Sequence, residues 1–105
     1  MRNFLRGGMV LLVAFALALP TLAESAKSLH KKGQKAEQLG NYEEAFNLYQ
    51  QAFEQSPKEV KYRVSAQRTR YLASGSYVRR GQLLREAGQL ENALALFEKA
   101  AQIDP

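Results

Sequence analysis

The chain repeats a pattern of residues at an interval of 48, and this repeat constrains its fold more than any other feature. Residues 26–57 and residues 74–105 are identical at nine of their 32 aligned positions. The identical pairs are Ser28/Ser76, Gly33/Gly81, Gln34/Gln82, Gly40/Gly88, Glu43/Glu91, Ala45/Ala93, Leu48/Leu96, Ala52/Ala100 and Pro57/Pro105. Two copies of one structural unit therefore account for most of the chain.

The pattern within each copy predicts two helices joined by a tight turn. Gly40 and Gly88 suit the left-handed conformation that commonly ends a helix. Asn41 then stands at the N-cap position of the next helix, with a glutamate three residues later, as in a capping box. Ala45 and Ala52 lie on one face of that helix, where small side chains allow a neighbouring helix to approach closely. We therefore predict an all-α fold with two helix hairpins.

This pattern resembles the tetratricopeptide repeat family. In the second helix of each unit of that family, an alanine is followed four positions later by an aromatic residue, and a proline follows the helix. The matching residues are Gly33, Ala45, Tyr49, Ala52 and Pro57 in the first copy, and Tyr77, Gly81, Ala93, Phe97, Ala100 and Pro105 in the second. The first helices depart from the family, because Lys32 and Arg80 stand at its leucine position. The resemblance implies an α-solenoid that binds other proteins.

The interval of 48 exceeds the family's period of 34 residues, and the excess predicts a long central helix. Ser56-Pro57-Lys58-Glu59 has the composition of a helix start, with Ser as N-cap and Pro at the first helical position. The one weak point before Ala87 is Gly75, and an interior glycine costs only about 1 kcal/mol relative to alanine. We predict a single helix of 31 residues over 57–87, with two helices broken at Gly75 as the alternative.

The central segment also carries most of the positive charge. Residues 58–85 contain eight Lys and Arg against one Glu, a net charge of +7, whereas the whole chain carries +5. At 100° per residue two apolar faces form, which predicts a helix packed between neighbours on both sides. One face holds Val60, Val64, Tyr71 and Val78, and the other holds Tyr62, Ala66, Ala73, Tyr77 and Leu84. Between them, Lys61, Arg68 and Arg79 line one edge, and Arg63, Arg70 and Arg85 line the other.

The first 23 residues have the layout of a secretory signal peptide. A basic start, Met1–Arg6, precedes eleven uncharged apolar residues, Met9–Leu19, and small residues stand before Glu24. The apolar run falls short of the roughly 20 residues that a membrane-spanning helix needs. We expect cleavage after Ala23, export to the periplasm or cell envelope of a bacterium, and a helical domain over 24–105. An uncleaved anchor and a buried helix are the alternatives.

Two strings within the central segment resemble repeats that precede the ring-forming domain of bacterial secretin-like proteins. They are Arg68-Thr69-Arg70-Tyr71-Leu72 and Arg80-Gly81-Gln82-Leu83-Leu84-Arg85. This resemblance implies a role in type II secretion or type IV pilus machinery. Because the chain contains no ring domain, the resemblance further implies an N-terminal fragment or a detached homologue.

The composition argues against an enzyme and against a bound cofactor or metal. The chain has no Cys and one His, which removes disulfides, thiolate metal sites and Cys nucleophiles. His30 is expected to be solvated or packed on a helix. Glu43, Glu44 and Glu91 stand in the first turns of helices, where the helix dipole favours negative charge. A moderate positive charge does not by itself indicate nucleic-acid binding.

The sequence therefore predicts a non-catalytic scaffold that binds another envelope protein. The candidate partner-binding residues are Lys27, Lys31, Gln34, Lys61, Arg63, Arg68, Arg70, Arg79, Gln82 and Arg85. Some family members clamp a C-terminal carboxylate with Lys and Asn, but no Asn stands at the corresponding positions here, so we expect a less specific groove. The alternatives are a structural module that self-associates or docks on its own C-terminal domain, and a basic helix that binds anionic lipid or glycan.

Overall fold

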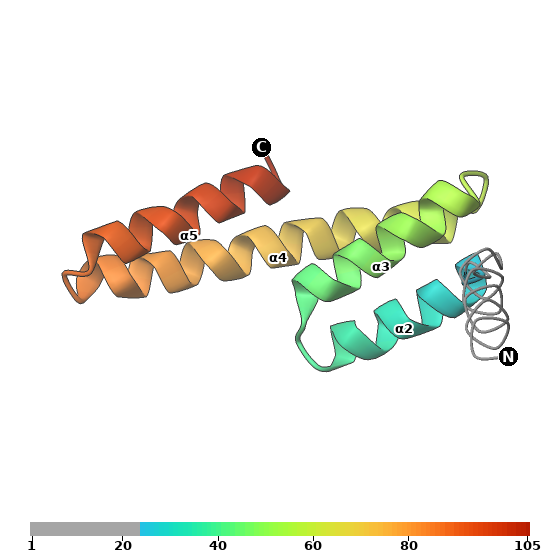
Figure 1. Cartoon of the computed structure of the whole chain (residues 1–105), viewed down its shortest axis with the longest axis horizontal. Helices are drawn as coiled ribbons and strands as arrows, with labels where there is room; N and C mark the ends of the chain where they lie inside the picture. Colours follow the sequence, from blue (N-terminus) through green and yellow to red (C-terminus); the bar gives the residue numbers. More distant parts are fainter. Residues whose placement is uncertain (1–23) are drawn as a thin grey trace, which may run out of the picture.

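The computed structural model describes residues 24–105, which form four helices and no strand (Figure 1). The helices are α2 (Ala26–Gln38), α3 (Tyr42–Gln55), α4 (Val60–Glu86) and α5 (Leu90–Ile103). Helix α2 packs on α3, α3 packs on the N-terminal half of α4, and α5 packs on the C-terminal half of α4. The predicted all-α fold, with two hairpins and an extended central helix, is confirmed. The predicted signal peptide, residues 1–23, lies outside the described residues.

Both hairpins turn at a glycine in the left-handed conformation. The φ angles of Gly40 and Gly88 are +79° and +81°, a region that residues with a Cβ atom disfavour. In the first turn the Gly40 amide donates to the Glu37 carbonyl at 3.0 Å, and the Asn41 amide donates to the Ala36 carbonyl at 2.9 Å. These are the two bonds of a Schellman motif, so the predicted glycine turns are confirmed.

The predicted side-chain cap at Asn41 is wrong. Asn41 precedes α3 as expected, but its side chain makes no capping hydrogen bond. Its ψ of 72° departs from the extended conformation in which a cap side chain reaches the helix amides. The first turn of α3 instead has Glu43 and Glu44 to interact with the helix dipole.

Helix α4 runs unbroken through Gly75, which confirms one continuous helix rather than two. It begins at Val60, however, and has 27 residues instead of the predicted 31. The expected helix start is a turn, because the Glu59 amide donates to the Ser56 carbonyl at 3.0 Å with Pro57 in between. The chain has to reverse direction between α3 and α4, and these residues make that reversal.

The core lies where α2, α3 and the N-terminal half of α4 meet. Its buried residues are Ala26, Leu29, Ala36, Ala45, Tyr49, Ala52, Tyr62 and Ala66. The side chain of Tyr49 is completely buried and lies against Gly33 of α2. A Cβ atom at Gly33 would stand 2.7 Å from the Tyr49 ring, so only glycine admits this close approach. Gly81 of α4 admits Phe97 of α5 in the same way.

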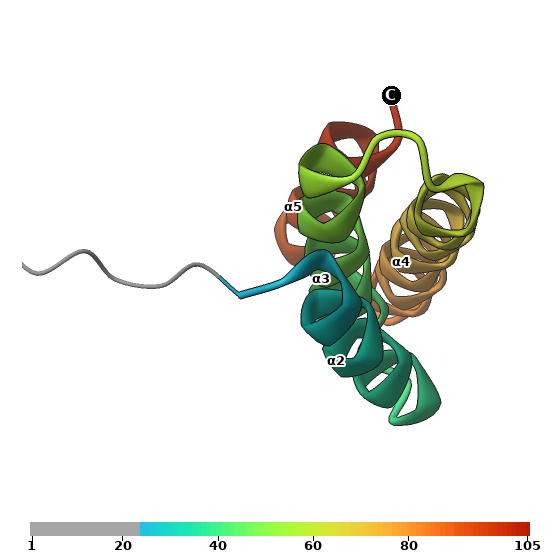
Figure 2. The ribbon, with the colours of Figure 1, turned by 90° about the vertical axis from the view of Figure 1, so that its right-hand side faces the viewer.

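The prediction that α4 packs between neighbours on two sides is wrong. Viewed along the molecule, α3 and α5 lie on the same side of α4 (Figure 2). The face that contains Tyr62, Ala66 and Ala73 is buried as expected. The opposite face, which contains Val64 and Tyr71, is exposed, because α3 and α5 both pack against the buried side of α4.

Candidate functional site

An open groove runs between α2 and the N-terminal half of α4, with α3 beneath it. It is lined by His30, Gln34, Glu37 and Gln38 from α2, Tyr49 from α3, and Lys61, Ser65 and Arg68 from α4. The three groove residues His30, Gln34 and Glu37 are spaced by four and three positions, so the helical period places them on one face of α2. Most of these groups are hydrogen-bond donors, which suits a ligand that has carbonyl or carboxylate oxygens.

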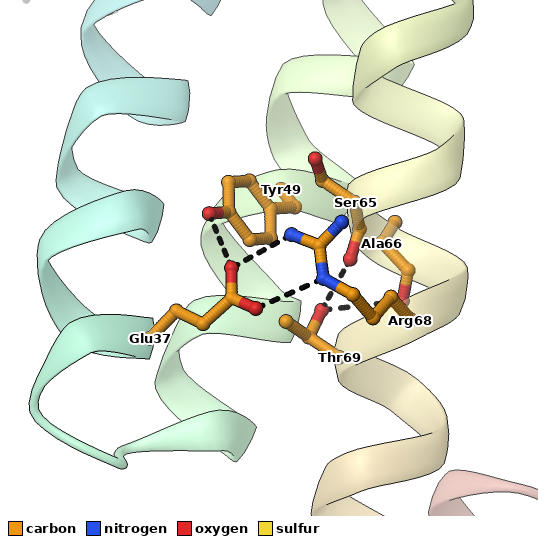
Figure 3. Close-up of polar contacts among 6 residues, drawn as sticks. All are labelled: Glu37, Tyr49, Ser65, Ala66, Arg68 and Thr69. Atoms are coloured by element: carbon orange, nitrogen blue, oxygen red, sulfur yellow. Dashed lines mark hydrogen bonds and ion pairs between the residues drawn. The ribbon is translucent and has the colours of Figure 1, made fainter.

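Three of the lining residues, Glu37, Arg68 and Tyr49, form a hydrogen-bonded network (Figure 3). The Arg68 guanidinium donates from Nε to Glu37 Oε2 at 2.9 Å and from its second amino group to Oε1 at 2.8 Å. The Tyr49 hydroxyl donates to Glu37 Oε1 at 2.8 Å. The two-point ion pair is a geometrically specific contact that holds α4 to α2 across α3.

The network shifts the pKa values of its members in the directions that favour the ion pair. The hydrogen bond from Arg68 lowers the pKa of Glu37 below its ordinary value, and Glu37 in turn raises the pKa of Arg68. Burial, together with the bond to Glu37, raises the pKa of Tyr49 to about 12. Tyr49 therefore stays neutral and the pair stays charged at physiological pH.

His30 lies on the groove wall between two aromatic rings. Its ring centroid is 5.1 Å from that of Tyr49 and 5.0 Å from that of Tyr62. Burial lowers the pKa of His30, and the positive charges of Lys61 and Arg68 lower it further. His30 is therefore neutral near pH 7 and presents one ring donor and one acceptor.

Small residues on α4 let this helix lie close to α3. Thr69 is fully buried, and its hydroxyl donates to the Ser65 carbonyl at 2.7 Å and lies 3.2 Å from the Ala66 carbonyl (Figure 3). Its only polar side-chain atom is thus satisfied within α4 itself.

The structure brings three of the predicted partner-binding residues together in the groove, namely Gln34, Lys61 and Arg68. Lys27 and Lys31 are exposed on α2. Arg63, Arg79, Gln82 and Arg85 are exposed on α4. Their role in binding stays a prediction.

The two predicted basic edges of α4 are interrupted, because two of their members already have partners. Arg68 is ion-paired with Glu37. Arg70 is half-buried, and its guanidinium lies 5.3 Å from the centroid of the Phe46 ring on α3. Arg70 Nε is buried and has no hydrogen-bond partner within the described residues, so part of this side chain is enclosed by the packing of α4 on α3.

A second cluster, which the sequence did not reveal, joins the two hairpins at Tyr77. The Tyr77 hydroxyl donates to the carboxylate of Glu43 at the start of α3. The Arg80 and Lys99 cations lie 5.2 Å and 5.1 Å from the centroid of the Tyr77 ring. Glu43 and Tyr77 belong to different copies of the repeat, and no local pattern pairs them.

Residues 24–105 contain no group of three or more His, Cys, Asp or Glu side chains that could hold a metal ion. None of the helices in this range has the length and apolarity that a membrane-crossing helix requires.

Paired antiparallel helices with glycine turns and an open groove between successive first helices define a helical repeat protein. The family model of the tetratricopeptide repeat matches residues 26–59 and 74–105. The chain belongs to the tetratricopeptide repeat family. The comparison with curated proteins and the comparison with solved structures each returned no match.

Proposed function

We propose that the chain is a scaffold that holds an extended segment of a partner protein in the groove between α2 and α4. Domains of this family bind protein partners and are generally non-catalytic. The observation that supports this groove is the convergence of Gln34 on α2 with Lys61 and Arg68 on α4, which follow Gln34 by 27 and 34 positions.

The chemistry of the groove indicates the kind of segment that it accepts. Lys61 and Arg68 contribute two positive charges, and Glu37 contributes one negative charge that Arg68 already neutralises. Lys61 forms no ion pair within residues 24–105, although its Nζ lies 5.4 Å from the centroid of the Tyr62 ring, so its charge favours an acidic side chain. The amide of Gln34 can bond to the backbone of an extended peptide. A neutral His30 adds a further bond without a charge.

Site-specific photo-crosslinking in cells tests this proposal. A photoreactive residue at Gln34 should form crosslinks to a discrete partner, and one at Lys35, exposed on the same helix outside the groove, should not. Adding Lys61→Glu should reduce the crosslink at Gln34. Equal crosslinking at both positions, or no effect of Lys61→Glu, would show that the groove is not the binding site.

We also propose that the protein is exported to the bacterial cell envelope, on the strength of the signal-peptide layout of residues 1–23. Mass spectrometry of the protein from its host should find a chain that begins at Glu24. An intact Met1 or Arg2 start would contradict export by cleavage. A place in secretion or pilus machinery is a further proposal, supported by the resemblance of residues 68–72 and 80–85.

A structural role is a second candidate function, and one observation favours it. Leu90 and Leu94 on α5 are exposed, although apolar residues at the equivalent positions of α3 are half-buried. We propose that α5 associates with another helix, from a second copy or from a C-terminal domain of the same protein. Sedimentation of the purified chain as a monomer, unchanged by Leu94→Ser, would contradict self-association.

A further inference from the structure

The outer face of α4 presents an uncovered apolar stripe along most of the helix. The stripe consists of Val60, Val64, Tyr71 and Val78, whose exposed fractions are 60%, 48%, 71% and 36%. At 100° per residue these four positions fall within about 40° of one another. Their span of 18 residues corresponds to about 27 Å of helix. The stripe is exposed, whereas α3 and α5 both lie on one side of α4 (Figure 2).

Cations flank the stripe on both edges. Lys61 and Arg79 lie along one edge, and Arg63 and Arg85 lie along the other, all four of them exposed. Within residues 24–105 none of these four forms an ion pair. One acid, Asp104 at the end of α5, borders the stripe beside Tyr71 and Arg79. The surface is therefore apolar along its centre and positively charged on its sides.

We propose that an acidic amphipathic helix of a partner protein docks along this stripe of α4. Its apolar side chains would cover Val60, Val64, Tyr71 and Val78, and its flanking carboxylates would meet the cations on each edge. Spacings of four and seven positions are those that one helix presents to another. The length of the stripe matches a partner helix of about five turns.

Charge complementarity and side-chain size separate this occupant from two others. A second copy of the chain would place cations against cations on both edges, which opposes association. Helices that lie in a membrane interface insert Trp, Phe or Leu side chains, whereas this stripe has three valines and a tyrosine. Short β-branched side chains on a rigid helix are better suited to packing against another helix.

The stripe is a different surface from the groove between α2 and α4. Its four residues do not line the groove, and the Glu37–Arg68 pair lies on the groove side of α4. Lys61 borders both surfaces, but Tyr71 and Arg79 do not line the groove, so substitutions of these two residues leave the groove intact. Failure of one proposal does not entail failure of the other.

Fluorescence anisotropy with two matched helical peptides tests the proposal. Both peptides carry the same leucine stripe, long enough to match that of α4, and one is flanked by glutamates and the other by lysines. The purified chain should bind the glutamate peptide and not the lysine peptide, and more salt should weaken binding because the flanking charges are exposed. Equal binding of the two peptides, or no binding of the glutamate peptide, would overturn the proposal.

Matched variants locate the binding on the stripe. Tyr71→Ser should weaken binding of the glutamate peptide by about tenfold, as truncation of a central interface aromatic does. Arg79→Glu should weaken it most at low salt. Leu39→Ser removes an equally exposed apolar side chain, 71% accessible, from the far end of α2, and Lys35→Glu reverses a cation on α2. Both controls should bind normally, and a loss as large as that of Tyr71→Ser would overturn the assignment to the stripe.

Two more measurements on the same variants exclude the other occupants. In co-sedimentation with vesicles of phosphatidylglycerol and phosphatidylcholine, the unaltered chain and Tyr71→Ser should give the same result. Vesicle binding that Tyr71→Ser abolishes, without peptide binding, would assign the stripe to a membrane surface. In sedimentation, the unaltered chain and Tyr71→Ser should have the same oligomeric state. Self-association that Tyr71→Ser removes would assign the stripe to a second copy.

Discussion

The two hairpins of this protein share their repeat residues but differ in what covers them. The α2–α3 hairpin packs against the N-terminal half of α4, so that Tyr49 is completely buried and Phe46 is half-buried. The second hairpin, formed by α5 and the C-terminal half of α4, has no such third helix in the described structure. Leu94, the equivalent of Phe46, is 57% exposed.

This difference shows that a third helix buries the outward-facing residues of a repeat unit. Both hairpins bury the alanines of their second helix, for Ala45 and Ala93 are almost fully inaccessible. These positions face the first helix of the same unit. Positions such as Phe46 and Leu94 face outward from the hairpin, and burial there depends on the next helix. We therefore expect the two copies of the pattern to differ in stability.

The largest expected effect comes from truncating the equivalent residues Phe46 and Leu94. Phe46→Ala should lower the free energy of unfolding by about 2–3 kcal/mol, because it removes a half-buried ring that packs on the core. Leu94→Ala should change it by less than about 0.5 kcal/mol, since that side chain is mostly solvated. Urea titrations followed by circular dichroism measure both values. Equal losses would mean that Leu94 is covered in solution.

The two close glycine–aromatic approaches should respond unequally to an added methyl group. Gly33→Ala drives a Cβ into the fully buried Tyr49 ring, and overpacking of this kind costs about 1–3 kcal/mol. Gly81→Ala meets Phe97 even more closely, but Phe97 is only half-buried, so its ring has room to shift toward solvent. Its cost should be offset by the gain of about 1 kcal/mol in helix propensity. We expect Gly33→Ala to lower the melting temperature and Gly81→Ala to leave it close to that of the unaltered chain.

The ion pair that joins α2 to α4 should make the first unit sensitive to acid. Because the folded-state pKa of Glu37 lies below its ordinary value of 4.5, the stabilisation is complete above pH 4.5 and disappears as the pH falls through the lower value. Arg68→Gln should therefore cost about 0.5–1 kcal/mol at pH 7 and less at lower pH.

Arg79→Gln serves as the control for that prediction, because Arg79 is an exposed cation on the same helix and forms no ion pair in the described range. Arg79→Gln should leave the free energy of unfolding unchanged both at pH 7 and at the lower pH. A cost for Arg68→Gln that does not depend on pH would show that Glu37 contributes nothing through its charge.

The smallest expected effect is a gain at the junction between the two halves of α4. Gly75→Ala should raise the free energy of unfolding by about 0.5–1 kcal/mol, because Gly75 is helical and a Cβ atom there meets nothing nearer than Arg79 at 3.5 Å. Thermal unfolding followed at 222 nm measures the gain. A loss would mean that α4 bends or breaks at Gly75 in solution.

Local features of the sequence were sufficient to predict the helices and turns. Gly40 and Gly88 end their helices because few residues other than glycine adopt a positive φ at low cost. Gly75 did not break α4, because one unfavourable residue is outweighed by the helical residues on either side. The start of α4 could not be predicted in this way. Ser56 and Pro57 suit both a helix start and a turn, and the packing of α4 on α3 selects the turn.

The repeat, its family, the all-α class and the positive charge of the central helix all follow from the sequence alone. The tertiary structure was needed to show which charges are available, because Arg68 pairs with Glu37 from 31 positions away and Arg70 packs on Phe46. It also decided that one apolar face of α4 stays uncovered. Helical periodicity shows that a residue lies on a face, but the presence of a partner for that face depends on contacts between segments far apart in the chain.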